Sequence, residues 1–300
     1  MSQKPKVYFT KTITPEKVLE MYKILNVKLP GNIGVKVHSG EKGNQNFIRP
    51  DFIKPLVDYV GGTIIETNTA GGNSIPGERT STEKHKKLLE FHEWTKYFKK
   101  VEILDDEPPD EEVKIPNGLI LKKNYLGRHT KKYDSILVIS HFKWHGFGGF
   151  GGALKQLSIG FSSAVGKTYV HSAGESLDPE TVLQHICGDK EFMESMADAA
   201  SVIVDRYKGK MAFVTLMKNI SIDCDCDGHA RPPCMKDIGI LSSIDPVAID
   251  KACLDLIYNS KDPGKEKLIE RIEKKLGPHT IESAIKLGYG TNEYELINVD

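Results

Sequence analysis

Short runs of apolar and β-branched residues alternate with amphipathic segments along almost the whole chain of 300 residues. This alternation is typical of a parallel β-sheet whose strands are joined by helical crossovers. We therefore predict an α/β protein with two Rossmann-like lobes, mainly parallel sheets and flanking helices. The predicted strands cover residues 7–10, 33–38, 63–69, 101–104, 135–140, 168–171, 211–217, 238–241 and 294–298.

Side-chain caps mark several helix starts. Thr80 and Glu83 form a capping box ahead of a predicted helix that continues to about Phe98. A capping residue followed by proline also favours a helix start. Three such pairs occur, at Thr14-Pro15, Asp178-Pro179 and Asp245-Pro246.

Residues 105–124 interrupt the alternation of strands and helices. An acidic, proline-containing stretch is followed there by a predicted β-hairpin insertion over 113–123, with a Pro-Asn-Gly turn. We place a domain boundary at this insertion. It separates an N-terminal α/β lobe, residues 1–110, from a C-terminal α/β lobe, residues 111–300, which carries the glycine-rich loop and the cysteines.

The composition limits the classes of partner. The chain has 41 lysine and arginine residues and 41 aspartate and glutamate residues, so we expect neither nucleic acid nor a membrane surface as a partner. No apolar run approaches the roughly 20 residues of a membrane helix, and the N-terminus lacks a signal core. We therefore expect a cytoplasmic protein, whose 5 cysteines stay reduced for metal binding or burial.

The stretch from residue 135 to 155 carries the strongest functional signal. An apolar run, expected to be a buried strand, ends at His141, and residues 141–155 contain 2 histidines, 2 lysines and 5 glycines. Glycine is entropically unfavourable in an ordered loop unless the backbone approaches another group closely. The spacing also contains a Gly-x-Gly-x-x-Gly fingerprint, but its distance from the strand disfavours a dinucleotide. We predict cofactor contacts at Gly148, Gly149, Gly151 and Gly152.

His141, Lys143 and His145 alternate in the sequence, so an extended backbone places their side chains on one face. We predict His141, His145 and Lys155 as catalytic residues, because imidazoles transfer protons near neutral pH and an amine binds an anion. Lys143 is a predicted cofactor contact. Backbone amides at the start of a helix near Ala153 are expected to favour an anion as well.

Other polar residues follow neighbouring predicted strands. His38 follows the second strand, Asn68 lies at the end of the third, and Cys224 and Cys226 come shortly after the strand over 211–217. Ligands of parallel sheets bind beyond the carboxyl ends of the strands. We therefore expect these side chains to meet the 141–155 loop at one edge of the sheet, with His38 and Asn68 as cofactor contacts.

The cysteines near residue 225 are candidate metal ligands. Cys224 and Cys226 can bind one soft cation, and Cys234, with or without His229, completes a set of ligands for zinc or an iron-sulfur cluster. Standard zinc knuckles place two residues between their cysteines, however. A polar surface turn with incidental thiols is the alternative.

These motifs are together similar to the family known as domain of unknown function 362, and the resemblance covers nearly the whole chain. Relatives are often labelled iron-sulfur proteins because many carry a ferredoxin module, but this chain lacks the Cys-x-x-Cys-x-x-Cys run of that module. The matching segments are 35–41, 66–70, 84–85, 141–155, 223–228 and 237–250.

Residues 145–171 also resemble, more distantly, the core of the nickel-pincer lactate racemase family. The intervals between His145, Lys155 and His171 are the same as in that family. The resemblance implies that His145 is an acid or base, Lys155 a cofactor or anion contact, and His171 a metal ligand.

Three functional hypotheses follow from the sequence. The first is an enzyme that depends on zinc, iron, nickel or an iron-sulfur cluster and acts on a small organic anion between the lobes, by redox or isomerase chemistry. The second is a non-catalytic iron-sulfur protein that transfers electrons or clusters to a redox partner protein. The third is a binding module stabilised by structural zinc.

Overall fold

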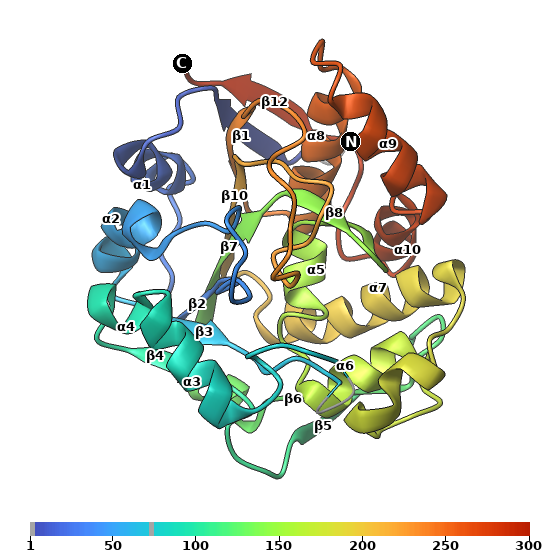
Figure 1. The fold of residues 1–300 in the computed structure, drawn as a ribbon. Helices are drawn as coiled ribbons and strands as arrows, with labels where there is room; N and C mark the ends of the chain where they lie inside the picture. Colours follow the sequence, from blue (N-terminus) through green and yellow to red (C-terminus); the bar gives the residue numbers. More distant parts are fainter. Residues whose placement is uncertain (1–3, 72–74) are drawn as a thin grey trace.

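The computed structural model describes residues 4–71 and 75–300. Helices α1, α2 and α4 cover one face of a central sheet, and α5, α7, α8 and α10 cover the other (Figure 1). The α-helices are α1 (Pro15–Lys23), α2 (Pro50–Val60), α3 (Thr82–Phe91), α4 (Trp94–Tyr97), α5 (Ala153–Leu157), α6 (Ala164–His171), α7 (Asp189–Arg206), α8 (Pro246–Tyr258), α9 (Lys265–Lys274) and α10 (His279–Lys286).

The central sheet contains 8 strands and is mostly parallel, which confirms the predicted α/β class. Only β11 runs against its neighbours among these strands, because it pairs antiparallel with both β10 and β1. The strand order is β12 (Glu295–Asn298), β1 (Lys6–Thr10), β11 (Gly239–Ser243), β10 (Met211–Met217), β7 (Ser135–His141), β2 (Ile33–Lys36), β3 (Thr63–Glu66) and β4 (Val101–Ile103).

Strand β7 lies in the middle of the sheet and pairs in parallel with β10 and β2. All seven of its residues are buried. A parallel strand with helices on both faces must be apolar on both sides, and this requirement explains the continuous run Ile136–Ile139. The strand delivers His141 directly to the carboxyl edge of the sheet.

The predicted caps form where the sequence places them. The Thr14 hydroxyl accepts a hydrogen bond from the backbone N–H of Lys17, and the Asp245 carboxylate caps the start of α8. Asp178 caps a short 3₁₀ helix, η2 (Pro179–Gln184). A second 3₁₀ helix, η1, covers Arg128–Lys132.

The prediction over 80–98 is corrected in two respects. Ser81, and not Thr80, caps α3, because the Ser81 hydroxyl faces the backbone N–H of Lys84. The helix is also interrupted after Phe91, since Glu93 adopts a left-handed φ of 64° before α4 begins.

The strand predicted over 168–171 is wrong. These residues form the last turn of α6, which Ser163 caps by accepting a hydrogen bond from the backbone N–H of Gly166. The β-branched residues Thr168 and Val170 suggested a strand, but tertiary packing decides the conformation. In a helix, Lys167 and His171 are one turn apart and lie on the same side.

Two hairpins flank the main sheet. The hairpin predicted over 113–123 is longer than expected: its strands are β5 (Glu111–Lys114) and β6 (Lys123–Leu126), and most of 113–123 connects them. In the second hairpin, β8 (Lys143–His145) pairs with β9 (Gly149–Gly151). The division at residue 110 stays a prediction. Strands from both sides of that position join one sheet, and β1 lies between β11 and β12.

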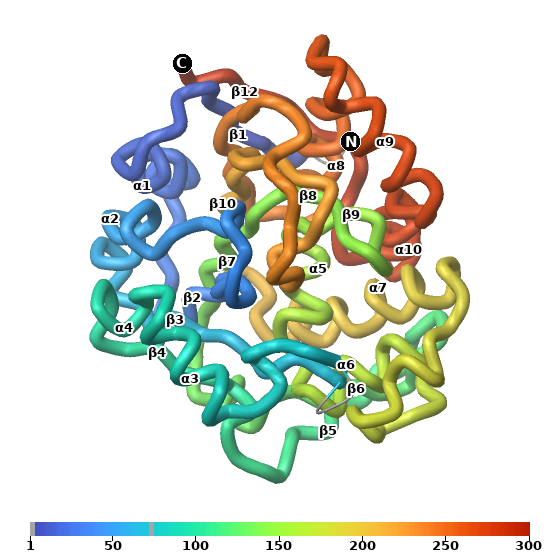
Figure 2. The backbone as a smooth tube through the Cα atoms, in the orientation of Figure 1, coloured from blue at the N-terminus to red at the C-terminus, as the bar shows by residue number. Residues whose placement is uncertain are grey.

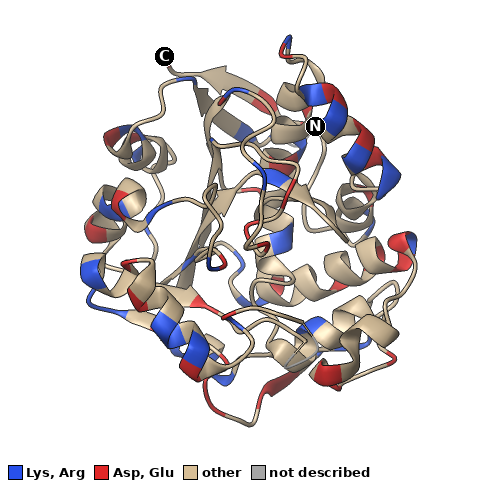
Figure 3. Ribbon diagram, in the orientation of Figure 1, with Lys and Arg blue, Asp and Glu red and all other residues tan. Residues whose placement is uncertain are grey.

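Charges of both signs are distributed along the outer helices, as on α9 (Figure 3). Every helix in the described residues is too short or too polar to cross a bilayer.

Candidate active site

A cavity of about 200 Å³ lies at the carboxyl ends of β2, β3 and β7. Sites for drug-sized ligands have volumes of roughly 300–1,000 Å³, so this cavity suits a smaller molecule. The predicted site residues that line it are His38, His141, Lys143, His145, Gly151, Gly152, Lys155, His171 and Cys226.

The alternation of His141, Lys143 and His145 brings all three side chains to the segment that contains Cys224 and Cys226, which we call the cysteine loop. The loop's central residue, Asp225, receives two of them: its carboxylate lies 2.9 Å from Nδ1 of His141 and 2.6 Å from Nζ of Lys143. Burial alone would raise the pKa of Asp225, but the charges of His141 and Lys143 outweigh it and lower that pKa. Asp225 therefore stays ionised and anchors the loop.

His141 has no ring nitrogen left for catalysis in this arrangement. Its Nδ1 faces the Asp225 carboxylate, and its Nε2 lies 2.6 Å from the backbone carbonyl oxygen of Lys218. Both partners are acceptors, so both nitrogens donate when both hydrogen bonds form. The geometry gives His141 the role of positioning Asp225.

Cys224 and Cys226 have their sulfur atoms 2.7 Å apart. The Cys224 sulfur also lies 3.3 Å from the backbone N–H of Cys226 and 3.7 Å from Nζ of Lys155. Burial opposes ionisation of Cys224, but the hydrogen bonds from Cys226 and His145 and the charge of Lys155 lower its pKa well below the ordinary value. A thiolate is the form of cysteine that binds metals and attacks electrophiles.

The cysteine loop is fastened to the loop that follows β2, and the two lie side by side in Figure 2. The Asn44 side-chain amide donates to the backbone oxygens of Cys224 and Asp227, at 3.1 and 2.9 Å. The backbone N–H of Glu41 donates to the Asp225 carbonyl oxygen. These contacts fix the positions of both sulfurs.

His145 lies in one group with Cys224 and Cys226, and the potential ligand atoms of these three residues all lie within 4.8 Å of one another. Nδ1 of His145 accepts a hydrogen bond of 2.9 Å from the backbone N–H of Gly148. The neutral ring therefore carries its proton on Nε2. Metal ligation through Nε2 would break this hydrogen bond, so His145 is better suited to donate a hydrogen bond from Nε2 than to hold a metal.

His171 has the opposite tautomer. Its Nδ1 lies 2.6 Å from the carbonyl oxygen of Lys167, one turn earlier in α6, and so donates to it. Burial lowers the pKa of His171 to about 4. The ring is therefore neutral near pH 7 and has an unprotonated Nε2, which is the form required of a base or a metal ligand.

The glycines near 150 make room for the chain's own side chains. The Asp250 carboxylate accepts hydrogen bonds from the backbone N–H groups of Ala153 and Leu154, at 2.7 and 2.9 Å. A Cβ atom at Gly152 would lie 2.3 Å from an oxygen of Asp250. The helix start predicted to bind an external anion is therefore filled by Asp250, which corrects that expectation.

Gly148 and Gly149, two of the predicted cofactor contacts, lie outside the cavity lining. A Cβ atom at Gly148 would lie 3.2 Å from Nδ1 of His145. Gly149 has a φ of 69° and packs against Gly277. Both glycines serve the packing of this loop.

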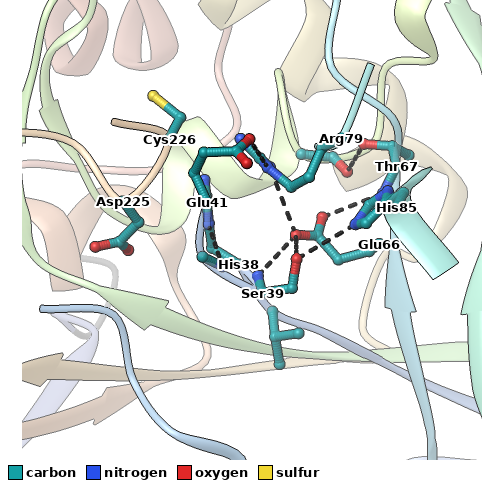
Figure 4. A network of polar contacts seen from close by, with 12 residues as sticks. His38, Ser39, Glu41, Glu66, Thr67, Arg79, His85, Asp225 and Cys226 are labelled. Atoms are coloured by element: carbon teal, nitrogen blue, oxygen red, sulfur yellow. Dashed lines mark hydrogen bonds and ion pairs between the residues drawn. The ribbon is translucent and has the colours of Figure 1, made fainter. Parts of the chain in front are cut away.

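A buried charge network forms another part of the cavity lining (Figure 4). Glu66 accepts hydrogen bonds from Lys36 at 2.8 Å and from the backbone N–H of Ser39 at 2.8 Å. Burial raises the pKa of Glu66, but the charges of Lys36 and Arg79 outweigh it and hold that pKa well below its usual range. The Ser39 hydroxyl in turn contacts His85.

Two cations of the cavity wall lack a full set of partners. Nε of Arg79 is buried without a hydrogen bond, although Glu41 lies 3.5 Å away. Lys155 contacts the Cys224 sulfur and has no carboxylate within 4.0 Å among the described residues. An anion in the cavity would satisfy both groups.

The remaining predicted residues have other surroundings. Cys234 directs its thiol to the carbonyl oxygen of Ile220, 3.4 Å away, and lies outside the group formed by His145, Cys224 and Cys226. Within the described chain, the four-cysteine set of a common iron-sulfur cluster is therefore not assembled. Asn68 hydrogen bonds to Thr82 and contacts His85 without lining the cavity.

His38 lines the cavity and accepts a hydrogen bond from the backbone N–H of Gly40. Burial and the charges of Arg79 and Lys143 hold the pKa of His38 well below its ordinary value. His38 is therefore a neutral ring on the cavity wall.

Sequence reasoning missed several charged residues of the site. Lys36 and Glu66 lie at the ends of apolar strands, where a buried charge is unusual and signals an ion pair or a ligand contact. Asp225 lies between the two cysteines in the sequence, and an alternating arrangement would place its side chain on the face opposite the two thiols. Arg79 comes from a loop and leaves no comparable signal.

The fold and the site together define an α/β protein with a cation-rich cavity and a cysteine pair at the carboxyl edge of its sheet. The chain belongs to the family described as Domain of unknown function (DUF362), which matches residues 33–255 and confirms the resemblance of the motifs. No curated protein matches the chain.

Two solved structures share similarity with the chain. One is a protein from Thermotoga maritima, with 14% identity and a TM-score of 0.38 over 91% of this chain and 59% of that one. The other is the lactate racemase apoprotein from Thermoanaerobacterium thermosaccharolyticum, with 13% identity and a TM-score of 0.37 over 70% of this chain and 50% of that one. The chain thus spans only 50% to 59% of the length of these proteins.

Proposed function

We propose that the protein is an enzyme that moves a proton on a small organic anion, beside a thiophilic metal ion held by Cys224 and Cys226. One observation carries the proposal: Cys226, whose sulfur lies 2.7 Å from that of Cys224, lines a cavity whose lining includes five lysine or arginine side chains and two carboxylates. Soft thiolates suit zinc, iron or nickel, and the surrounding positive charge favours an anionic substrate.

The cavity has groups for both directions of proton transfer. Nε2 of His171 is unprotonated and accepts a proton from the carbon next to the substrate carboxylate. His145 donates its Nε2 proton back to that carbon from the doubly protonated ring, because a neutral imidazole is too weak an acid. Both rings pack against Phe147, with centroids 5.2 and 6.3 Å from its ring centroid. Removal from one side and return from the other would invert the carbon, which is isomerase chemistry.

Positive charge at the cavity wall would stabilise the negative charge that develops when the proton leaves. Lys155 and Arg79 supply this charge and bind the carboxylate. A metal ion on the two sulfurs would add Lewis-acid polarisation of a substrate oxygen. Cys234 and His141, which the sequence suggested for metal binding and catalysis, have no part in this proposal.

Hydrogen exchange in D2O tests the proton transfer. The protein, purified without oxygen, is incubated with a panel of 2-hydroxy and 2-amino carboxylates, and loss of the signal of the proton on the carbon next to the carboxylate is followed by NMR. We expect exchange in at least one class, and a loss of at least 100-fold in rate for His145→Gln, the size typical of a general acid or base.

His229→Gln is the matched control, because the His229 side chain is fully exposed. It should exchange at the wild-type rate. Absence of exchange in both classes, or equal rates in His145→Gln and His229→Gln, would count against proton transfer in this cavity.

A further inference from the structure

The cavity lining carries both cationic and apolar side chains. Its cations include Arg79, close to Glu66, and Lys155, which contacts the Cys224 sulfur. One apolar part of the lining, the apolar end, is built from a loop residue before β9, a residue after α5, and the segment around η2. The apolar lining residues in these segments are Phe147, Ile159, Val182, Leu183 and Ile186.

The apolar end is positioned next to His171. The backbone N–H of Cys187 donates a hydrogen bond of 2.9 Å to the His171 carbonyl oxygen, which ties the segment after Ile186 to the end of α6. Phe147 packs edge-on against the His171 ring. Val182 is buried beneath this wall, and Leu183 remains 53% exposed at its rim.

Arg79, on the charged part of the lining, lies 3.5 Å from Glu41. Arg79 is only 5% exposed, lines the cavity and has an Nε atom without a hydrogen-bond partner. Buried polar groups are rarely left unpaired, because losing water without a replacement partner costs roughly 1–3 kcal/mol. A ligand carboxylate is the complement of this group and of Lys155.

Resting on the proposed function, we infer that the substrate is an amphipathic carboxylate: its carboxylate lies at Arg79 and Lys155, and its apolar side chain extends past His171 to Phe147, Val182 and Leu183. A dry cavity of roughly 150 Å³ holds benzene. The volume of about 200 Å³ therefore limits the whole substrate, carboxylate included, to roughly eight non-hydrogen atoms.

A series of straight-chain carboxylates tests the inference. Acetate, butyrate and hexanoate are titrated by calorimetry into protein purified without oxygen, with hexylamine as the cationic counterpart of hexanoate. The dissociation constant should fall roughly fourfold for each methylene added, and hexylamine should not bind. Equal affinity for the three acids, or binding of hexylamine as tight as that of hexanoate, would overturn the inference.

Two leucines provide a matched pair of variants. Leu183 lines the cavity, whereas Leu177 is outside it and has a similar exposure of 45%. Leu183→Ser should weaken hexanoate binding by about tenfold and leave acetate binding unchanged, and Leu177→Ser should change neither. Lys155→Gln should weaken all three acids. Equal effects of the two leucine variants would contradict the assigned position of the side chain.

Metal content, measured on the same samples, separates this inference from the proposed function. Chain-length dependence without bound metal would support the amphipathic subsite and reject the metal-dependent function. Bound metal and hydrogen exchange without chain-length dependence would reject the subsite alone.

Discussion

The carboxylate of Asp225 lies 2.6 Å from Nζ of Lys143, and this buried ion pair fixes the segment that carries the two cysteines. Both side chains are at most 3% exposed. Because Asp225 points to one side of the loop, Cys224 and Cys226 are presented together on the other side. The sulfur pair therefore depends on a residue that contacts neither the cavity nor a metal.

Asp225→Asn should destabilise the protein. The substitution leaves Lys143 without its ionised partner, and breaking a buried ion pair lowers the free energy of unfolding by about 3–5 kcal/mol. Urea denaturation followed by circular dichroism measures the change. Asp227→Asn, at an acid with 47% side-chain exposure, is the control and should stay within about 0.5 kcal/mol of wild type. Similar values for the two variants would refute the anchoring role.

The effects of substituting Lys36 and Glu66 on the free energy of unfolding should be strongly coupled. Their charged atoms lie 2.8 Å apart with side-chain exposures of 1% and 3%. Lys36→Met and Glu66→Gln should each lower the free energy of unfolding by about 3–5 kcal/mol, and the double variant should lose less than the sum of the two. Denaturation of all four proteins completes the cycle, and strictly additive losses would show that the pair does not interact.

Asp250 should make stability decrease as the pH rises. Burial raises its pKa to about 7, above the value of about 4 in an unfolded chain. The folded state therefore retains a proton that the unfolded state releases, so this contribution to stability is complete below about pH 4 and is lost as the pH rises through 7.

Asp250→Asn cannot ionise and lacks this pH dependence. Relative to wild type, the variant should become progressively more stable between pH 5 and pH 8, even if the loss of one hydrogen bond to α5 lowers its stability throughout. Chemical denaturation at several pH values measures the difference. A constant difference would mean that Asp250 is already ionised at pH 5.

The sheet and its functional edge were predictable because their signals are local. The apolar run before His141 identified the central strand, and the alternation of His141 with Lys143 and His145 predicted their common face. The α6 helix was mistaken for a strand because its β-branched residues follow local propensity, whereas its conformation depends on packing.

The site was less predictable because its decisive contacts join distant parts of the chain. The Asp250 carboxylate accepts hydrogen bonds from the backbone N–H groups of Ala153 and Leu154 and so occupies the anion site that the local sequence suggested. The hydrogen bond from Gly148 selects the tautomer of His145, and no sequence spacing encodes that choice. Arg79 reaches Glu66 from a loop without a periodic pattern.

Elemental analysis of protein purified without oxygen tests the metal site most directly. We expect zinc, iron or nickel near one equivalent per chain in wild type and in Cys234→Ser, and a large loss in Cys224→Ser and Cys226→Ser that retain the wild-type circular dichroism. Wild-type protein free of all three metals, or equal metal content in Cys224→Ser and Cys234→Ser, would contradict a metal centre at the paired sulfurs.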